Sequence, residues 1–288
     1  MSFGDSGSPW VRITDSGDVR LAGYRGLTDR RARQRIEDNL GVFIVEGVLA
    51  LGQLLASGYD VESILVATTR AEQVRDFLGL TAAPAYLAEP DVLASTAGFD
   101  VHRGVLALGR RRPPAAAADV LATAVATARP TVVVTEGVND HENLGAIFRN
   151  AAALGVGAVL ADPTTCDPLY RRSIRVSLGY ALRVPFARLI PWPAALAELG
   201  QAGWTILALS PSAKSEDLDD VAEEGLARVA ILVGAEGPGL TPETLAGADR
   251  RIRVPMAVGV DSLNVATAAA IAFHRLVPRL SRASGPPT

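Results

Sequence analysis

The chain has 288 residues, 49% of them hydrophobic, which is enough for two globular domains and too apolar for a disordered protein. Its single cysteine excludes an internal disulfide, and its three histidines lack the spacing of common metal-ligand motifs. Neither a disulfide scaffold nor a catalytic metal is therefore expected. The longest small-apolar stretch, residues 151–161, is too short to span a bilayer, and the first residues show no signal-peptide pattern, so we expect a cytoplasmic protein.

The formal net charge of −3 does not by itself indicate a nucleic-acid-binding protein. The basic residues, however, are almost all arginines, and they occur in groups. A GC-rich genome alone could produce the excess of arginine, but local basic stripes rather than net charge determine affinity for phosphates. The groups lie at residues 110–112, at residues 171–175, and at Arg30, Arg31, Arg33 and Arg35.

The first part of the chain predicts alternating helices and strands. Thr28 or Asp29 can cap a helix that runs to about residue 39, and Gly41 lies just past its end. Short apolar runs predict strands, and a helix through residue 56 follows the first of them. The predicted strands are residues 42–45, 64–67 and 104–108. This alternation is typical of a small α/β domain.

Residues 110–114, with the sequence RRRPP, mark the best domain boundary, because neither a helix nor a central strand accommodates them. We expect an N-terminal extension and small domain over residues 1–112 and a second domain over residues 113–288. In the second domain we expect an alanine-rich helix to residue 128 and a closing helix over residues 263–276. Continuous apolar runs between them predict a parallel sheet, with strands at residues 131–135, 158–160, 206–208 and 230–233.

Three turns containing glycine or asparagine follow strands of the second domain. They are NLGAIFRN at residues 143–150, GAEGPGL at residues 234–240, and VPM at residues 254–256 followed by DSLNVA at residues 261–266. Ligands of open α/β sheets bind outside the carboxyl ends of the strands, so these turns are candidate binding elements. A P-loop ending, a GxGxxG after a strand and a GxSxG elbow are all missing from the sequence. This argues against a Mg²⁺-nucleotide site, a dinucleotide site and a serine hydrolase.

The three turns resemble the three motifs of the SpoU/TrmH family of RNA 2′-O-ribose methyltransferases. N-x-G-A-x-x-R-x-A begins at Asn143, G-x-E-G-x-G-L begins at Gly234, and P-M is followed by S-L-N-V at Ser262, in the family's order and spacing. The resemblance covers residues 131 to about 276. More weakly, F-x-V-E-G at Phe43 and H-R-G-V at His102 are similar to the L30e-like substrate-binding domain of many members.

The resemblance implies an α/β fold in which a parallel sheet carries a deep C-terminal trefoil knot, the SPOUT fold, after a small L30e-like α/β domain. It implies a homodimer that uses S-adenosylmethionine without a metal and acts on RNA. Ribosomal RNA is favoured over transfer RNA because of the extra domain. The residues that the resemblance places at the cofactor are Leu209, Gly234, Val254, Met256 and Leu263.

Catalytic roles carry over from the family to Asn143, Arg149, Glu236, Ser262 and Asn264. The resemblance makes Arg149 the base, but a guanidinium, with a pKa above about 12, is a poor base near neutrality. We expect Arg149 instead to clamp phosphate and to stabilise the developing alkoxide, with the proton lost to water or to an RNA phosphate. The arginines at positions 30, 31, 33 and 35 are the predicted RNA contacts of the first domain.

Simpler interpretations of the same residues remain open. Asn143 could cap a helix, Glu236 could be a surface residue in a turn, and Ser262 and Asn264 could cap the last helix. For the whole protein the alternatives are a tRNA methyltransferase, a methyltransferase acting on a base nitrogen, and a catalytically silent RNA-binding protein on the same scaffold. Cofactor binding separates the silent protein from the enzymes.

Overall fold

The computed structural model describes residues 9–126 and 130–277, without the side chains at positions 30 and 32. The chain forms two compact units. Unit 1 comprises Met1–Pro113 and Leu169–Arg183, and unit 2 comprises Pro114–Pro168 and Val184–Thr288. The first crossing lies one residue from the boundary expected at 112/113. The segment Leu169–Arg183, which we expected in the second domain, instead packs in unit 1.

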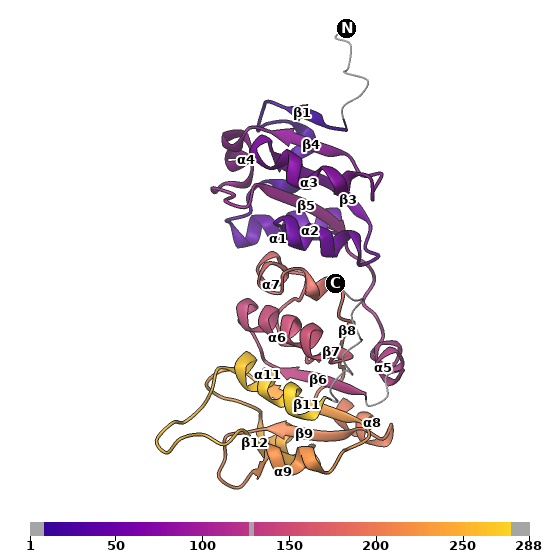
Figure 1. Cartoon of the computed structure of the whole chain (residues 1–288), viewed down its shortest axis with the longest axis vertical. Coiled ribbons are helices and arrows are strands. Elements are labelled where there is room, and N and C mark those ends of the chain that lie inside the picture. Colours follow the sequence, from indigo (N-terminus) through magenta and orange to yellow (C-terminus); the bar gives the residue numbers. More distant parts are fainter. Residues whose placement is uncertain (1–8, 127–129, 278–288) are drawn as a thin grey trace, which may run out of the picture. The chain divides into compact units, whose positions relative to one another are not determined.

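Unit 1 is built on a five-stranded mixed sheet with the strand order β1-β4-β3-β5-β2 (Figure 1). Strand β4 is parallel to β1 and β3, and β5 is antiparallel to β3 and β2. The three predicted strands are present, whereas the short β1 and β4 were not predicted because neither has an extended β-branched run. The bounds are β1 Val11–Ile13, β2 Val42–Glu46, β3 Val61–Ala67, β4 Ala85–Ala88 and β5 Val105–Arg110.

Helices cover both faces of this sheet. Residues from η1 and α4 join one apolar core with the strands, and α2 and α3 pack on the other face. The helix expected over 28–39 begins two residues later, as α1. The helices are α1 Arg30–Leu40, α2 Val48–Leu55, α3 Ala71–Leu78, α4 Pro90–Ala97 and α7 Arg171–Val176, with short 3-10 turns η1 Val19–Tyr24, η2 Thr68–Arg70 and η3 Tyr180–Leu182.

The α7 segment is held in unit 1 by a buried carboxylate. Glu46, at the end of β2, is 4% exposed. Its Oε2 accepts hydrogen bonds from Nη1 of Arg171 at 2.9 Å and from Nη1 of Arg175 at 3.4 Å. The Arg171 guanidinium also lies 4.5 Å from the centre of the Phe99 ring. Charge pairing therefore joins residues about 125 positions apart in the sequence.

Unit 2 is built on a seven-stranded sheet with the strand order β10-β12-β9-β11-β6-β7-β8, and every pairing in it is parallel. The predicted parallel sheet and its four predicted strands are confirmed; β8, β10 and β12 were not predicted. The strands are β6 Thr131–Glu136, β7 Ala158–Ala161, β8 Phe186–Arg188, β9 Thr205–Leu209, β10 Glu216–Asp217, β11 Val229–Gly234 and β12 Arg250–Arg253.

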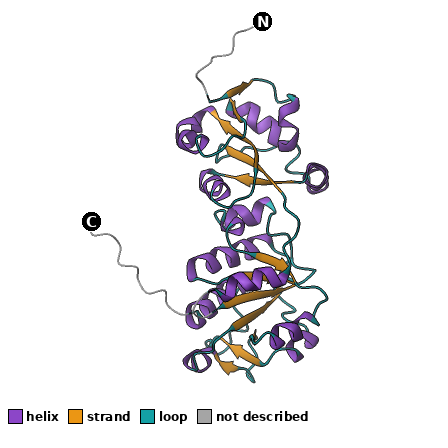
Figure 2. Cartoon of the chain, turned by 90° about the vertical axis from the view of Figure 1, so that its right-hand side faces the viewer, coloured by secondary structure: helices purple, strands orange, loops and turns teal. Residues whose placement is uncertain are grey.

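The sheet of unit 2 is covered on both faces, with α5 and α8 on one and α6 and α11 on the other (Figures 1 and 2). Val132 and Val134 of β6 face α5 and α8, and helix α11 packs along α6, where Asn150 Nδ2 donates to Ala266 O at 3.1 Å. The expected helix to residue 128 is α5, and residues 127–129 lie outside the described part. The helices are α5 Ala117–Val125, α6 His141–Leu154, α8 Ala195–Gln201, α9 Leu218–Glu223, α10 Pro242–Ala246 and α11 Val265–Leu276.

Within residues 9–126 and 130–277, no helix combines the length and apolar character needed to cross a membrane. The deep knot expected from the family resemblance stays a prediction, since strand order alone does not determine how the chain is threaded.

Candidate functional site

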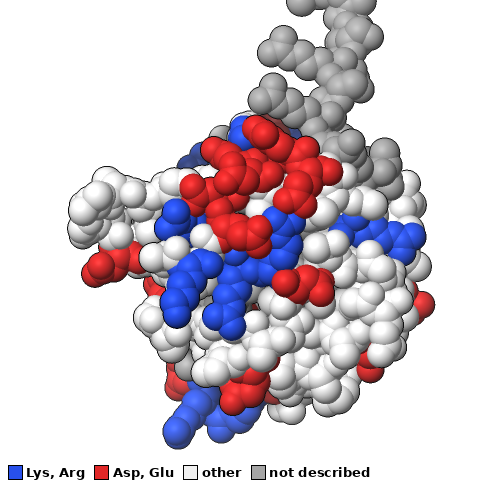
Figure 3. Space-filling model, turned by 90° about the horizontal axis from the view of Figure 1, so that it is seen from below, with Lys and Arg blue, Asp and Glu red and all other residues white. Residues whose placement is uncertain are grey.

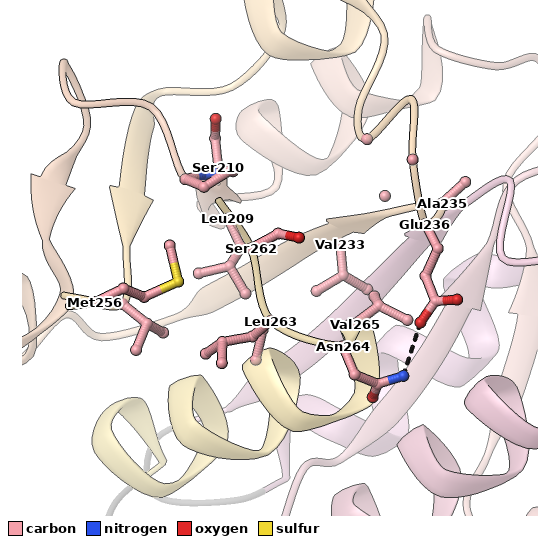
Figure 4. Close-up of a pocket in the computed structure, with 16 residues that line it drawn as sticks. Leu209, Ser210, Val233, Ala235, Glu236, Met256, Ser262, Leu263, Asn264 and Val265 are labelled. Carbon is pink, nitrogen blue, oxygen red and sulfur yellow. Dashed lines mark hydrogen bonds between the residues drawn. The ribbon is translucent and has the colours of Figure 1, made fainter. Parts of the chain in front are cut away.

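A cavity of about 460 Å³ opens where β9, β11 and β12 end in unit 2 (Figure 4). It lies outside the carboxyl ends of parallel strands, where the ligands of open α/β sheets bind, and it has the size of a small-molecule site. Five of its lining residues are the predicted cofactor contacts, which come from three separate segments of the chain. They are Leu209, Gly234, Val254, Met256 and Leu263.

The turn at residues 234–240 forms one wall of the cavity with its backbone. Gly239 N donates to Ala235 O at 3.0 Å, which folds the turn back on itself. A Cβ at Gly234 would stand 2.4 Å from the carbonyl carbon of Gly239 and 2.5 Å from Leu240 N. Only a glycine fits at position 234, because the atoms that crowd it are backbone and cannot rotate away. Two backbone segments therefore approach each other closely in this turn.

One asparagine joins the three motif segments beside the cavity; the first of them, residues 143–150, was predicted as a turn and instead lies in helix α6. Asn264 Nδ2 donates to Asn143 Oδ1 at 2.7 Å and to Glu236 Oε1 at 2.7 Å (Figure 4 shows the second contact). Ser262 and Glu236 also line the cavity. Four of the five predicted catalytic residues are thus at or beside the cavity, although their roles stay predictions.

The capping interpretations have different outcomes. Asp140, not Asn143, caps α6: its Oδ1 accepts from Glu142 N at 2.6 Å. Asn264 does cap α11, since its Oδ1 accepts from Ala266 N at 3.0 Å and from Thr267 N at 3.1 Å. Because the oxygen caps the helix, the NH₂ group is left to hold Asn143 and Glu236. Capping and a role in the site therefore coexist in this side chain.

Arg149 is not brought into the cavity. It lies on α6 with an exposed side chain and is not among the residues that line the cavity. In this structure its guanidinium is available to an external anion rather than to the cavity, which agrees with a phosphate clamp better than with a base beside the cofactor.

A buried carboxylate that sequence analysis missed fixes the loop before α6. Asp162, which follows β7 and is 1% exposed, accepts from Gly137 N at 3.1 Å and from Thr165 N at 2.7 Å. Burial by itself would raise the pKa of the Asp162 carboxyl, but hydrogen bonds from Thr164, Thr165 and Gly137 outweigh it, so the pKa is lowered. The charged carboxylate therefore holds the chain that leads to Asn143.

A second missed carboxylate is Glu136, the last residue of β6, which is 6% exposed. It accepts hydrogen bonds from Trp192 Nε1 at 2.8 Å, from Thr241 N at 2.9 Å and from Thr244 Oγ1 at 2.6 Å. An acidic residue at the end of an apolar strand was the available signal for both carboxylates. The sequence does not show, however, which donors would surround them.

A family model described as the SpoU rRNA Methylase family matches residues 130–274, about half of the chain. The chain belongs to this family. It is 45% identical to an uncharacterized tRNA/rRNA methyltransferase of Mycobacterium bovis. The similarity extends over 263 residues, which are 91% of this chain and 90% of that protein. It is 31% identical to the 23S rRNA (guanosine-2′-O-)-methyltransferase RlmB of Ralstonia nicotianae. This similarity extends over 218 residues, which are 75% of this chain and 86% of that protein.

Among solved structures, the AdoMet-bound rRNA methyltransferase from Sinorhizobium meliloti matches with a TM-score of 0.75 at 22% identity. The match covers 93% of this chain and 98% of that one, and it supports the fold. The predicted SpoU family and the enzyme class, an RNA methyltransferase, are confirmed. The L30e-like character of unit 1 stays a prediction.

For a SpoU protein the placement of the arginines matters, and one predicted RNA contact is wrong. Arg33 is 6% exposed, its guanidinium lies 3.8 Å from the centre of the Tyr170 ring, and its Nη1 is 3.5 Å from Glu37 Oε1. Buried against a ring and a carboxylate, Arg33 stabilises unit 1. Arg31 and Arg35 are exposed on α1 and can still reach a phosphate, and the side chain of Arg30 lies outside the described part.

The edge of unit 2 at β10 and β12 also carries arginines, and two of them, Arg250 and Arg253, are paired with carboxylates. Figure 3 shows a face on which acidic side chains gather beside basic ones. At strands β10 and β12, Arg250 Nη1 lies 2.6 Å from Glu224 Oε2, and Arg253 Nε lies 2.5 Å from Asp217 Oδ1. Because these charges compensate one another locally, this edge is not where we expect RNA phosphates. Among the described residues, no group of three or more His, Cys, Asp or Glu side chains could hold a metal ion.

Proposed function

We propose that this protein transfers a methyl group from S-adenosylmethionine to a ribose 2′-hydroxyl of RNA. One observation carries the proposal. The second and third SpoU motif segments line a single cavity, and Asn264 ties Glu236 to Asn143, of the first motif on α6, at its edge. The cofactor supplies an electrophilic methyl group on its sulfonium sulfur, so the protein needs chiefly to bind and orient the two reactants.

The residues of the cavity fit such a cofactor. Leu209, Met256 and Leu263 give it apolar walls suited to an adenine ring, and the glycine turn offers backbone groups to polar atoms. Gly234 has no space for a Cβ, so this part of the wall is bare backbone. A small cavity with apolar walls and a few fixed polar groups is the usual form of a site for a nucleotide-like ligand.

The protein's own polar residues position the ribose. The Asn264 NH₂ group fixes both Asn143 and Glu236, so these side chains are oriented before substrate arrives. Ser262 reaches the same cavity from the neighbouring turn. Exposed Arg149, outside the cavity, clamps an RNA phosphate, and the proton of the hydroxyl passes to water or to an RNA phosphate.

The substrate class we propose is ribosomal RNA rather than transfer RNA. Support comes from the relative named as a 23S rRNA methyltransferase, whose similarity spans 75% of this chain. Arg31 and Arg35, exposed on α1, supply phosphate contacts in unit 1. Their affinity should depend on salt, because each phosphate contact releases counterions.

We also propose that the protein is a homodimer, as the family resemblance implies. The small-residue face of α11 does not offer an interface, because it is buried within the chain: Ala266, Ala269 and Phe273 are at most 4% exposed. The exposed apolar residues near the cavity, Val258 and Val260, are the better candidates for the interface. Light scattering should give about twice the monomer mass of 30.1 kDa, and a monomer mass at micromolar concentration would contradict the dimer.

The proposed function is tested in two steps. Calorimetric titration of chelator-treated protein with S-adenosylmethionine, with and without RNA, should show binding; none at millimolar cofactor in either case would contradict the proposal. Mapping of 2′-O-methyl groups in ribosomal and transfer RNA from cells with and without the gene should show one lost site in ribosomal RNA. Loss of a site in transfer RNA would show that the substrate is transfer RNA, and loss of a base methylation would show that the methyl group goes to a base rather than to the ribose.

A further inference from the structure

The turn at residues 234–240 is a wall of the cavity, and both of its ends lie beside one residue of the neighbouring strand. Strand β11 runs parallel to β6, and Gly234, the first residue of the turn, is in register with Glu136. Thr241, which directly follows the turn, donates its backbone N–H to Glu136 Oε2 at 2.9 Å. The residue that pairs with the beginning of the turn therefore also holds its end.

The direction of the Glu136 side chain follows from the period of the strand. Val132, Val134 and Glu136 alternate with residues of the opposite face, so Glu136 points to the side of the sheet that α5 and α8 cover. Trp192 and Leu240 belong to the same side. The carboxylate is consequently buried next to the end of the turn, away from the cavity itself.

The hydrogen bonds of Glu136 use its two oxygens unequally. Oε1 accepts from Trp192 Nε1 at 2.8 Å, from Thr241 Oγ1 at 3.0 Å and from Thr244 Oγ1 at 2.6 Å. Oε2 accepts from the backbone N–H of Thr241. These partners are an indole, two hydroxyls and an amide, all of them neutral. Directional hydrogen bonds to a charged acceptor, rather than an ion pair, thus hold the carboxylate in place.

We propose that Glu136 is a positioning residue for cofactor binding, which it serves by fixing the turn at residues 234–240 in the shape that lines the cavity. The inference rests on the proposed function, because it takes S-adenosylmethionine as the ligand of the cavity. Thr241 also caps helix α10, and Thr244, which is fully buried in the first turn of that helix, bonds to the other oxygen of the carboxylate.

Glu136→Gln tests the proposal because the amide cannot reproduce both oxygens. Turned so that its oxygen meets the three donors at Oε1, the amide places its NH₂ group against the N–H of Thr241, and two donors then oppose each other. The disturbance falls on the residue that ends the turn. We expect the Kd for S-adenosylmethionine, measured by calorimetry at 25 °C, to rise at least about tenfold, which is 1.4 kcal/mol.

Thr244→Val is the matched control. Valine has the shape of threonine and removes the hydroxyl that bonds to Glu136 Oε1 and to Thr241 Oγ1, but it leaves the bond from Thr241 N to Glu136 Oε2 intact. It should lower the melting temperature as Glu136→Gln does and leave the Kd within about threefold of wild type, about 0.6 kcal/mol. Hydrogen exchange of the peptide covering residues 234–241 should quicken in Glu136→Gln and not in Thr244→Val.

The outcomes separate the two proposals. If wild-type protein does not bind the cofactor with or without RNA, the proposed function fails. If wild type binds and Glu136→Gln binds within threefold of it, or Thr244→Val weakens binding as much, the positioning role is overturned and Glu136 is a general stabilising residue. Should Glu136→Gln not fold, Glu136→Asp carries the same test, since it withdraws the carboxylate from Thr241; an unchanged Kd would again overturn the proposal.

Discussion

Each unit buries a glutamate at the carboxyl end of a strand, Glu46 after β2 and Glu136 after β6, and surrounds it differently. Glu46 pairs with the guanidinium groups of Arg171 and Arg175, whereas Glu136 accepts from neutral donors. Charge pairs hold a distant segment in unit 1, where attraction tolerates some freedom of geometry. Directional neutral bonds fix a turn in unit 2, where the position of backbone atoms decides whether a ligand fits.

The comparison also explains why arginine groups in the sequence misled us about one RNA contact. Arg33 and Arg171 belong to two of these groups, and the guanidinium groups of both contact aromatic rings and carboxylates inside unit 1. Motif residues of unit 2 were easier to place, because a glycine or asparagine in a turn reports a local requirement of the backbone. A group of arginines in the sequence indicates local positive charge, but it does not show whether that charge is exposed or paired within the fold.

Arg33→Ala tests the charge pairs of unit 1 and has the largest expected effect on the free energy of unfolding. It removes the contact with Tyr170 and one of the two guanidinium groups near Glu37, which is 4% exposed; the other, Arg111 Nη2 at 3.5 Å from Glu37 Oε2, remains. Breaking a buried pair costs about 3–5 kcal/mol of unfolding free energy. Urea unfolding measures this. Arg31→Ala and Arg35→Ala are the controls: each should cost less than about 0.5 kcal/mol.

The same variants sharpen the RNA prediction. Each exposed arginine lost should flatten the slope of log K against log salt by about 0.9 if it contacts duplex-like RNA. An unchanged slope in Arg31→Ala and Arg35→Ala would show that α1 faces solvent, not RNA.

Asn264→Asp would separate the two roles of Asn264, capping of α11 and positioning of Asn143 and Glu236 for methyl transfer. The carboxylate keeps an oxygen for the N–H groups of Ala266 and Thr267, so the melting temperature should stay near that of wild type. It loses the NH₂ donor and faces Glu236 with a second negative charge. Single-turnover methylation should fall about 10²- to 10³-fold, as for loss of one preorganised contact. Wild-type activity would show that Asn264 is only a helix cap.

Gly234→Ala would test how closely the turn must pack. Its Cβ has no space against Gly239 and Leu240, so the turn must move, and cofactor binding should weaken about 100-fold, near 2.7 kcal/mol. Gly237→Ala is the control within the same turn: no atom lies within 4 Å of the new Cβ, and the positive φ of 87° costs about 1–2 kcal/mol of strain. Equal loss of binding in both variants would mean that backbone strain, rather than packing around Gly234, weakens cofactor binding.

Asp162→Asn has the smallest expected effect, about 1–2 kcal/mol of unfolding free energy at neutral pH, because most of its hydrogen bonds can persist. The pKa of Asp162 is below its ordinary value of 3.8. Its contribution to stability is therefore fully present above pH 3.8 and is lost as the pH falls through the lower folded value. Urea unfolding from pH 7 to pH 3 should show a shallower acid decline in the variant, and parallel declines would contradict the charged state.

Much of unit 2 could be predicted from the sequence, because its strands are continuous apolar runs and its cavity is built from turns with few allowed residues. The turns that hold Gly234 and Asn264 could be located in this way, and the family resemblance supplied the roles of the two residues. Glu136 and Asp162 were not, since their role depends on donors that are distant in the sequence, such as Trp192 and Gly137. Strand β4, of sequence AYLA, was missed because alanine has little preference for strands.

The segment Leu169–Arg183 gives the chain an unusual connectivity, since unit 1 is assembled from two stretches separated by part of unit 2. Residues 1–113 expressed alone would lack α7, and Glu46 would stay buried without Arg171 or accept water in its place. A fragment starting at residue 114 would carry α7 with Ile174, fully buried in the whole chain, exposed to solvent. A chimera that exchanges unit 1 between relatives must therefore transplant residues 169–183 together with residues 1–113.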